Sequence, residues 1–278
     1  MSQLKTIKNK NVSSIRAMKG REKIAMLTAY DYPTALMLDE AGVDILLVGD
    51  SVNTVLYGED TTLSITLEQM LMHSKMVSRG TQQAMVVGDM PFMSYQISIE
   101  KAVAAAGRFL KEAGVQAVKL EGGVEMAETV RAITRAGIPV MAHIGLTPQS
   151  IHAMGTYRSF GKSDSERQYL FESARELESA GAFSVVLECV ESGLSESITM
   201  SLEIPTIGIG SGDSCDGQVL VVNDLLGLTI GHVPKFVRPE ADLRTEVIGA
   251  AIRYVQRTKG QTQDLQPKKG EVENAPRG

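Results

Sequence analysis

The chain has 278 residues, of which 43% are hydrophobic, and a formal net charge of −5. This balance is ordinary for a globular protein and argues against a nucleic-acid-binding surface. No apolar run approaches the ~18 residues of a membrane span. Because Cys189 and Cys215 are too few for a disulfide framework or a cysteine metal site, we expect a reduced, cytoplasmic protein with no nucleic-acid or membrane partner.

The two ends of the chain differ from its middle. Residues 1–21 are basic and contain no acidic side chain, which favours a polar N-terminal arm, with a transit peptide as the alternative. From Thr258 onward, Lys, Gln, Pro and Gly dominate without periodicity. We therefore predict one domain over residues 1–257 and a disordered tail over residues 258–278.

Between these ends, short apolar runs alternate with helical patterns. The predicted strands are residues 24–29, 45–48, 84–87, 117–120, 140–143, 184–187, 206–209 and 235–237. Helical patterns include residues 66–79, 98–113, 124–136 and 165–180. Eight strand–helix units in about 240 residues favour a closed (β/α)8 TIM barrel, and a doubly wound open sheet is the alternative.

Four segments of the chain share one pattern. In each, a glycine at position 42, 114, 137 or 181 ends a helical stretch and predicts a left-handed helix cap. A strand follows and leads to ionisable residues, which are Asp50, Lys119, Glu121, His143 and Glu188. Because parallel strands end at one edge of a sheet or barrel, these side chains should meet at the C-terminal mouth, where such folds place their chemistry.

Three carboxylates follow or end three different predicted strands, namely Asp50, Asp89 and Glu121. Any one of them alone is more often a helix cap or a member of a loop ion pair. Together at one mouth they suit Mg²⁺, which binds a few carboxylates and completes its coordination with water and substrate oxygens. The sequence therefore predicts a magnesium site.

The remaining ionisable residues leave alternatives open. Lys119 shares a strand face with Glu121, so it is either half of a buried ion pair or a cation for a substrate carboxylate or enolate. His143 in an apolar strand is most often a hydrogen-bonded core residue. Glu188 follows three apolar residues and is a candidate general base, with a salt bridge to an arginine as the alternative.

At these residues the chain resembles the ketopantoate hydroxymethyltransferase family. The matching stretches are residues 18–24, 27–34, 48–51, 89–96, 118–122, 143–149, 187–189, 204–210 and 215–218. They follow one another in unbroken order over about residues 12 to 238. A match of that extent is far more specific than any single motif.

The resemblance implies a (β/α)8 barrel of the phosphoenolpyruvate/pyruvate-type superfamily and a transferase activity. The family moves a hydroxymethyl group from 5,10-methylenetetrahydrofolate to 3-methyl-2-oxobutanoate, a 2-oxo acid, and so forms 2-dehydropantoate for pantothenate and coenzyme A synthesis. Its members are commonly decamers, so the resemblance implies a homo-oligomer.

The resemblance also implies roles for individual residues. Asp50, Asp89 and Glu121 correspond to the Mg²⁺ site of the family, and Glu188 corresponds to its proton acceptor. The keto-acid contacts correspond to Asp50, Ser51, Asp89 and Lys119, and we assign His143 to the same substrate pocket. Residues 145–161 are candidates for one wall of the folate pocket.

The chain departs from the usual family pattern at Asn53, Ala142 and Thr156, where glycine is common. These changes leave open which keto acid and which one-carbon donor the protein uses. The alternative enzyme is a Mg²⁺-dependent C–C lyase or phosphomutase of the phosphoenolpyruvate mutase/isocitrate lyase type, but the Lys-Lys-Cys-Gly-His loop of such lyases is missing from the sequence. A non-catalytic, metabolite-binding barrel is a further alternative, which the complete set of ionisable residues disfavours.

Overall fold

The computed structural model describes residues 10–231 and 233–260, which belong to two compact units. The first unit ends at Val222 and the second begins at Asn223. The single domain expected over residues 1–257 therefore stays a prediction, and most of the expected tail, residues 261–278, lies outside the described residues.

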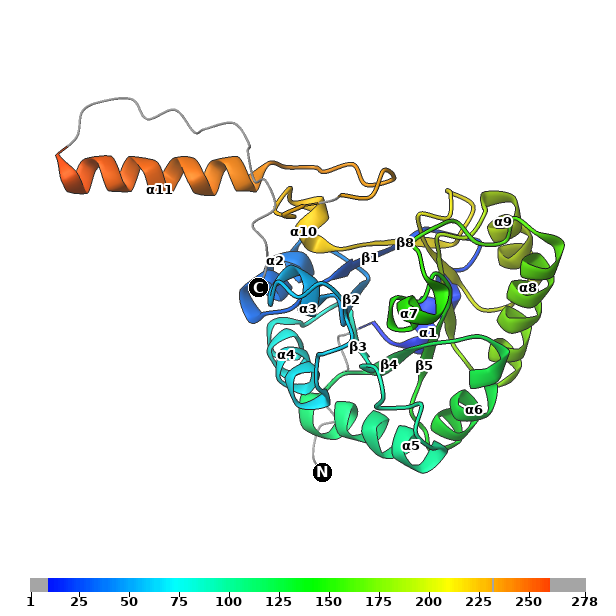
Figure 1. The fold of residues 1–278 in the computed structure, drawn as a ribbon. Coiled ribbons are helices and arrows are strands. Elements are labelled where there is room, and N and C mark those ends of the chain that lie inside the picture. Colours follow the sequence, from blue (N-terminus) through cyan, green and yellow to red (C-terminus); the bar gives the residue numbers. More distant parts are fainter. Residues whose placement is uncertain (1–9, 232, 261–278) are drawn as a thin grey trace. The chain divides into compact units, whose positions relative to one another are not determined.

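The first unit is a closed barrel of parallel strands, which confirms the predicted fold class (Figure 1). The strands pair in chain order and β8 closes on β1. They are β1 Ile24–Thr28, β2 Ile45–Val48, β3 Met85–Asp89, β4 Ala117–Glu121, β5 Val140–Gly145, β6 Ser184–Glu188, β7 Thr206–Ile209 and β8 Gly217–Leu220. The first seven predicted strands are confirmed to within two residues at either end.

The predicted eighth strand is wrong. Residues 235–237 contain a turn in the second unit, and the barrel closes instead through β8, Gly217–Leu220. This strand has a weak apolar pattern because it opens with glycine. Gly217 lies opposite Ile24 in the register, and a Cβ atom built on it would lie 2.5 Å from the Ile24 carbonyl oxygen. Close backbone packing at the seam, where β8 pairs with β1, therefore requires glycine at position 217.

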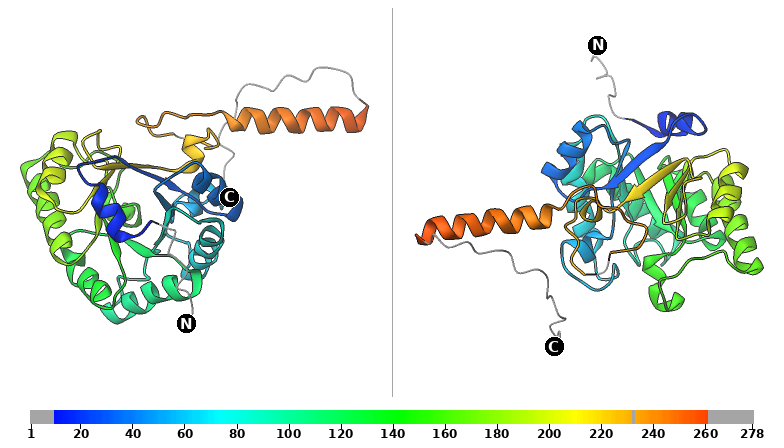
Figure 2. Two further views of the ribbon diagram at one scale, coloured as in Figure 1. Left: turned by 180° about the vertical axis from the view of Figure 1, so that it is seen from behind. Right: turned by 90° about the horizontal axis from the view of Figure 1, so that it is seen from above.

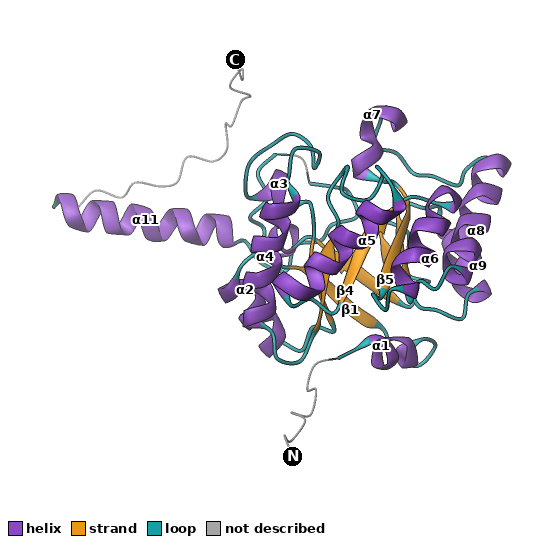
Figure 3. Cartoon of the chain, turned by 90° about the horizontal axis from the view of Figure 1, so that it is seen from below, coloured by secondary structure: helices purple, strands orange, loops and turns teal. Residues whose placement is uncertain are grey.

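Helices surround the barrel, as Figure 3 shows for the first unit. They are α2 Tyr32–Glu40, α3 Val52–Val55, α4 Leu67–Gly80, α5 Ile99–Arg108 with its π-helical continuation η1 Phe109–Ala113, η2 Val124–Met126, α6 Ala127–Arg135, η3 Pro148–Ser150, α7 Ile151–Met154, α8 Asp164–Ser179 and α9 Ser192–Ser201. The glycines at positions 42, 114, 137 and 181 all have positive φ, as predicted for helix caps. Among the described residues, no helix combines the length and apolar character that crossing a membrane requires.

Helix α1, Val12–Met18, occupies the segment that we expected to be a polar arm. Asn11 and Ser14 form a capping box at its start, and Ile15 and Met18 bury their side chains in the core cluster inside the barrel. That cluster contains residues from the beginnings of the strands, so α1 closes the N-terminal end of the barrel. Figures 2 and 3 show α1 across one end and α7 at the other.

The second unit contains one long helix. Helix α10, Val222–Leu225, spans the boundary between the units, and α11 runs over Leu243–Lys259. Asp242 caps the start of α11 by accepting a hydrogen bond from the Thr245 backbone N–H, and Gly260 ends it with φ 62°. Within the described chain, none of the α11 side chains is buried.

Candidate active site

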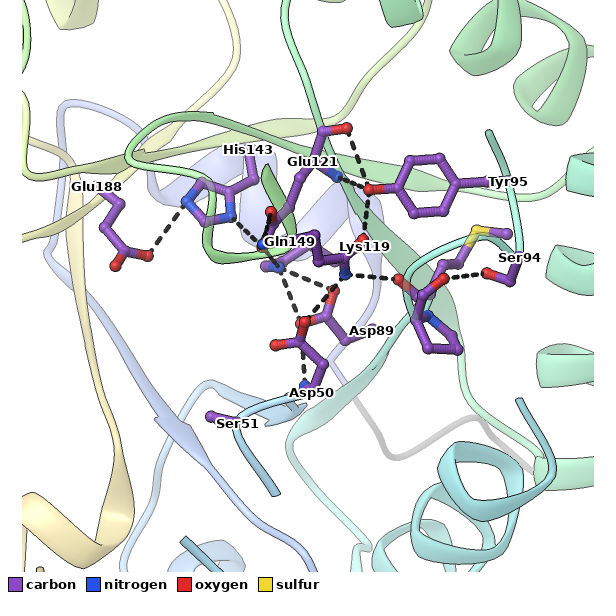
Figure 4. A network of polar contacts seen from close by, with 12 residues as sticks. Asp50, Ser51, Asp89, Ser94, Tyr95, Lys119, Glu121, His143, Gln149 and Glu188 are labelled. Carbon is purple, nitrogen blue, oxygen red and sulfur yellow. Dashed lines mark hydrogen bonds and ion pairs between the residues drawn. The ribbon is translucent and has the colours of Figure 1, made fainter. Parts of the chain in front are cut away.

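The C-terminal ends of five strands bring the predicted residues together (Figure 4). Asp50 and Ser51 follow β2, Asp89 ends β3, Lys119 and Glu121 lie in β4, His143 lies in β5, and Glu188 ends β6. Ser51 is fixed at the edge of this group by a 2.8 Å hydrogen bond between its hydroxyl and that of Tyr30. The shared position follows from the parallel register, in which Asp89 pairs with Lys119 and Glu121 pairs with His143.

Lys119 is a buried cation whose nearest partner is Asp89. Its Nζ donates to both Asp89 carboxylate oxygens, at 2.8 and 2.9 Å, whereas Glu121 Oε1 lies 4.0 Å away. The expected Lys119–Glu121 pair is therefore only the secondary contact. Burial alone would lower the pKa of Lys119, but the carboxylates of Asp89, Glu121 and Asp50 outweigh burial and raise it. The lysine is thus held in its charged form.

The carboxylates outnumber the cations around them. Burial, followed by the charges of Asp89 and Glu121, raises the pKa of Asp50 well above its usual range. The pKa of Asp89 is also raised, mainly by burial and against the opposing effect of Lys119. A divalent cation would relieve this crowding of negative charge, and carboxylate oxygens are ligands that Mg²⁺ prefers.

A cation here would depend on few protein ligands. In residues 10–231 and 233–260, no group of three acidic, histidine or cysteine side chains has the spacing of a complete metal site. Both Glu121 oxygens already face other groups, the Gln149 N–H at 3.0 Å and His143 Nδ1 at 3.5 Å. Both Asp89 oxygens likewise accept from Lys119, at 2.8 and 2.9 Å, whereas Asp50 accepts one side-chain hydrogen bond among the described residues, at Oδ2. Asp50 therefore fits Mg²⁺ best, with Asp89 beside it and water and substrate completing the shell.

His143 lies between two carboxylates. Its Nδ1 is 3.5 Å from Glu121 Oε1, and its Nε2 is 3.2 Å from Glu188 Oε2. Neither nitrogen has a partner at full hydrogen-bond geometry among the described residues, so the expected hydrogen-bonded core histidine is not what the structure shows. Burial and Lys119 lower the pKa of His143, yet the two carboxylates dominate and raise it from 6.5 to about 9. The imidazole is therefore charged at neutral pH.

Glu188 is the most accessible acidic group of the site. Its side chain is 18% exposed, compared with 3% for Glu121 and 2% for Asp89. Its ion-pair partner is His143, so the alternative of a salt bridge to an arginine is wrong.

Two further residues complete the polar network, and the sequence pattern had not indicated a role for either. Gln149 Nε2 donates to Asp50 Oδ2 at 3.0 Å, and the Tyr95 hydroxyl donates to Gln149 Oε1 at 2.8 Å. Both lie within stretches that match the family, but neither side chain is ionised at neutral pH. What marks Gln149 out is its burial, directly after Pro148, and a pattern of residue types cannot show burial of a polar side chain.

The family departures lie away from the carboxylates. Asn53 donates to the Thr61 carbonyl and the Ser64 hydroxyl, at 2.7 and 2.8 Å, and so ties together the loop after β2. Ala142 is buried and alternates with His143 along β5, so it points away from the barrel interior. Thr156 is exposed. None of the three replaces a group of the network.

The loop after α7 approaches Glu188. Phe160 N–H donates to the Cys189 carbonyl, and Glu191 N–H donates to the Phe160 carbonyl, both at 2.8 Å. Burial, and then the charge of Glu188, raises the pKa of Tyr157, which places that ring close to the site even though it is largely exposed. The predicted folate wall, residues 145–161, thus borders the group of carboxylates.

Comparisons with known proteins identify the family of the chain. The sequence model of the ketopantoate hydroxymethyltransferase family matches residues 9–263. A 3-methyl-2-oxobutanoate hydroxymethyltransferase of Syntrophus aciditrophicus (strain SB) is 55% identical over 251 residues, which cover 90% of this chain and 92% of that protein.

Solved structures share the fold at much lower identity. A putative phosphonomutase from Burkholderia cenocepacia J2315 superposes with a TM-score of 0.64 at 14% identity, over 90% of this chain and 99% of that one. Phosphonopyruvate hydrolase in complex with oxalate and Mg²⁺ gives 0.60 at 11% identity, over 94% and 92%. These likenesses establish the barrel fold, and the sequence matches are decisive for the family: the chain belongs to the ketopantoate hydroxymethyltransferases.

Proposed function

We propose that this protein transfers a hydroxymethyl group from 5,10-methylenetetrahydrofolate to 3-methyl-2-oxobutanoate and so forms 2-dehydropantoate for pantothenate and coenzyme A synthesis. Family membership supports the reaction, as does the name of the Syntrophus relative. The observation that carries the proposal is that the site has a buried charged side and an accessible side. A buried group of Asp50, Asp89 and Lys119 lies on one side, and an accessible carboxylate, Glu188, lies on the other.

The buried side suits a 2-oxo acid. Mg²⁺, when bound by Asp50 and Asp89, would supply Lewis-acid polarisation of the keto group. Lys119 adds a fixed positive charge within the same group and can stabilise the negative charge that develops on the substrate oxygen during enolisation. Ser51 lies next to Asp50, and its hydroxyl can donate a hydrogen bond to the substrate carboxylate.

The accessible side suits proton removal. In the proposed reaction Glu188 takes the proton from C3 of the keto acid, and His143 holds the carboxylate in place through its Nε2, 3.2 Å away. The C3 carbanion forms a bond to the methylene carbon of the folate. The attack breaks one carbon–nitrogen bond of the donor, and a water molecule then replaces the second nitrogen and supplies the hydroxyl oxygen. Tetrahydrofolate leaves with two protons on its nitrogens, one from that water and one from Glu188, which is thereby ready for the next cycle.

The donor needs a broad surface beside Glu188, and residues 145–161 are the segment that we propose for it. The exposed ring of Tyr157 can stack on a flat pterin there. We also propose that the protein is a cytoplasmic homo-oligomer. Its family and its two free cysteines support this setting, since neither cysteine is bridged.

The direct test is a product assay on purified protein with 5,10-methylenetetrahydrofolate and 3-methyl-2-oxobutanoate, with Mg²⁺ or with a chelator. We expect 2-dehydropantoate, detected by mass spectrometry, only with Mg²⁺. If no product forms while the protein cleaves or rearranges another 2-oxo acid, such as phosphonopyruvate, the proposal is wrong and the lyase or phosphomutase alternative is correct.

A further inference from the structure

Gln149 connects the strand ends of the site. It lies in η3, directly after β5, and is 3% exposed. Its backbone N–H donates to Glu121 Oε2 at 3.0 Å, so β4 is tied to η3. Its side-chain Nε2 donates to Asp50 Oδ2 at 3.0 Å and to the Met90 carbonyl at 2.9 Å, which reaches the ends of β2 and β3 (Figure 4).

The Tyr95 hydroxyl fixes which way the Gln149 amide faces. The hydroxyl lies 2.8 Å from Gln149 Oε1, closer than its other acceptor, the Glu121 carbonyl at 3.2 Å. It also receives the Glu121 N–H at 3.1 Å, so its own proton is directed toward Gln149. A flipped amide would turn its oxygen toward two acceptors, the Asp50 carboxylate and the Met90 carbonyl, and lose both hydrogen bonds.

The bond from Gln149 matters most for Asp50. Within the described chain it is the one hydrogen bond that the Asp50 side chain receives, and it reaches Oδ2. Asp89, by contrast, receives two bonds from Lys119 and one from the Asp50 N–H. The orientation of the Asp50 carboxylate is therefore set by a neutral amide, which leaves Oδ1 available without adding charge to the site.

We infer that Gln149, held by Tyr95, is a positioning residue that orients the Asp50 carboxylate for a divalent cation. The inference rests on the proposed magnesium-dependent function. Groups that orient metal ligands in this way are generally worth about 10–100-fold in metal affinity. A merely structural role would be carried by the backbone N–H on Glu121 and by the Nε2 bond to the Met90 carbonyl. Losing it would lower the stability of the protein without changing its affinity for the cation.

Three variants separate these roles. Gln149→Met keeps the volume and the backbone N–H but removes both amide donors. Tyr95→Phe removes the hydroxyl that orients the amide, together with its two bonds to the Glu121 backbone, and leaves the weaker bond from Gln96 Nε2 to Gln149 Oε1 at 3.3 Å. Tyr169→Phe is the matched control, because its hydroxyl bonds to Glu125 at 2.9 Å on the outside of the barrel.

The measurement is direct binding of Mn²⁺, followed by the loss of its free EPR signal, and of Mg²⁺ by calorimetry, both without keto acid or folate. We expect the dissociation constants to rise about 10-fold or more for Gln149→Met, by less for Tyr95→Phe, and not at all for Tyr169→Phe. Unchanged constants in folded Gln149→Met and Tyr95→Phe proteins would overturn the inference. If Gln149→Met fails to fold, Tyr95→Phe decides.

The double variant tests whether Tyr95 acts through Gln149. If it does, Tyr95→Phe/Gln149→Met should bind Mn²⁺ as Gln149→Met does, because the hydroxyl then has nothing left to orient. If the double variant instead raises the dissociation constant by the product of the two single effects, Tyr95 does not act through Gln149. Since no turnover is measured, a wild-type protein that binds Mn²⁺ but makes no 2-dehydropantoate would refute the proposed function and leave this inference standing.

Discussion

The charge on His143 should make the stability of the barrel depend on pH. The folded pKa of about 9 lies above the ordinary value of 6.5, so the folded state holds this proton more tightly than the unfolded chain does. The contribution is therefore complete below pH ~6.5 and is lost as the pH rises to about 9. A difference of about 2.5 in pKa corresponds to about 3 kcal/mol of unfolding free energy.

The perturbation is His143→Gln, which keeps a polar side chain but cannot become charged. Urea unfolding of both proteins from pH 5.5 to 10, with a chelator present, gives the stability difference at each pH. We expect that difference to shrink by about 3 kcal/mol between pH 6.5 and 9, on top of a pH-independent loss of packing. His152→Gln, which removes an exposed imidazole, is the control for the loss of a histidine side chain.

A second readout follows the proton itself. The chain has 4 histidines, and the imidazole resonance that disappears in His143→Gln identifies this one by NMR. Its titration midpoint should be near 9. A midpoint near 6.5, or a stability difference that stays constant from pH 6 to 9.5, would mean that Glu121 and Glu188 do not stabilise the charged ring, and the reasoning would fail.

Further substitutions test the other roles. Glu188→Gln should slow solvent deuterium exchange at C3 of the keto acid about 10²–10⁴-fold while substrate still binds, and normal exchange would remove Glu188 from the mechanism. Asp50→Asn should abolish Mg²⁺-dependent turnover with little loss of stability by urea titration. Asp89→Asn should also weaken the fold by about 3 kcal/mol, because it removes the nearest counter-charge of the buried Lys119 and leaves Glu121, 4.0 Å away, as its ion-pair partner; equal stabilities would contradict this. Gly145→Ala should destabilise by more than about 1 kcal/mol, since φ is 99° and a Cβ would lie 2.2 Å from the Glu188 carbonyl oxygen, while Gly107→Ala, in open space on a helix, should not.

The sequence predicted the parts of the fold that depend on local pattern. Seven strands were found because each is a short apolar run, and before four of them a left-handed glycine ends the preceding helical segment. The seam was missed because Gly217 is chosen by close packing against β1, a partner far away in the sequence. Helix α1 was taken for a polar arm because only Ile15 and Met18 of that segment are buried.

In the candidate site, too, some features could be predicted from the sequence and others could not. Asp50, Asp89 and Glu188 could be predicted to lie together, since ionised groups at strand ends stand out against apolar neighbours. Their pairings could not, because distances of 3 to 4 Å depend on side-chain rotamers and on the stagger between strands. Gln149 shows this most clearly, since an uncharged side chain becomes central only through the groups that it faces.

The closure of β1 on β8 also bears on how the chain folds as it is made. Lys19, just after α1, forms an ion pair at 2.8 Å with Asp216, 197 positions later, beside the seam. At ~5–20 residues per second, synthesis of the intervening chain takes about 10–40 s, during which the first strand has no partner on one edge. Ring closure is therefore a late, long-range event, and the unpaired edge of β1 is where a nascent chain would be most exposed to aggregation.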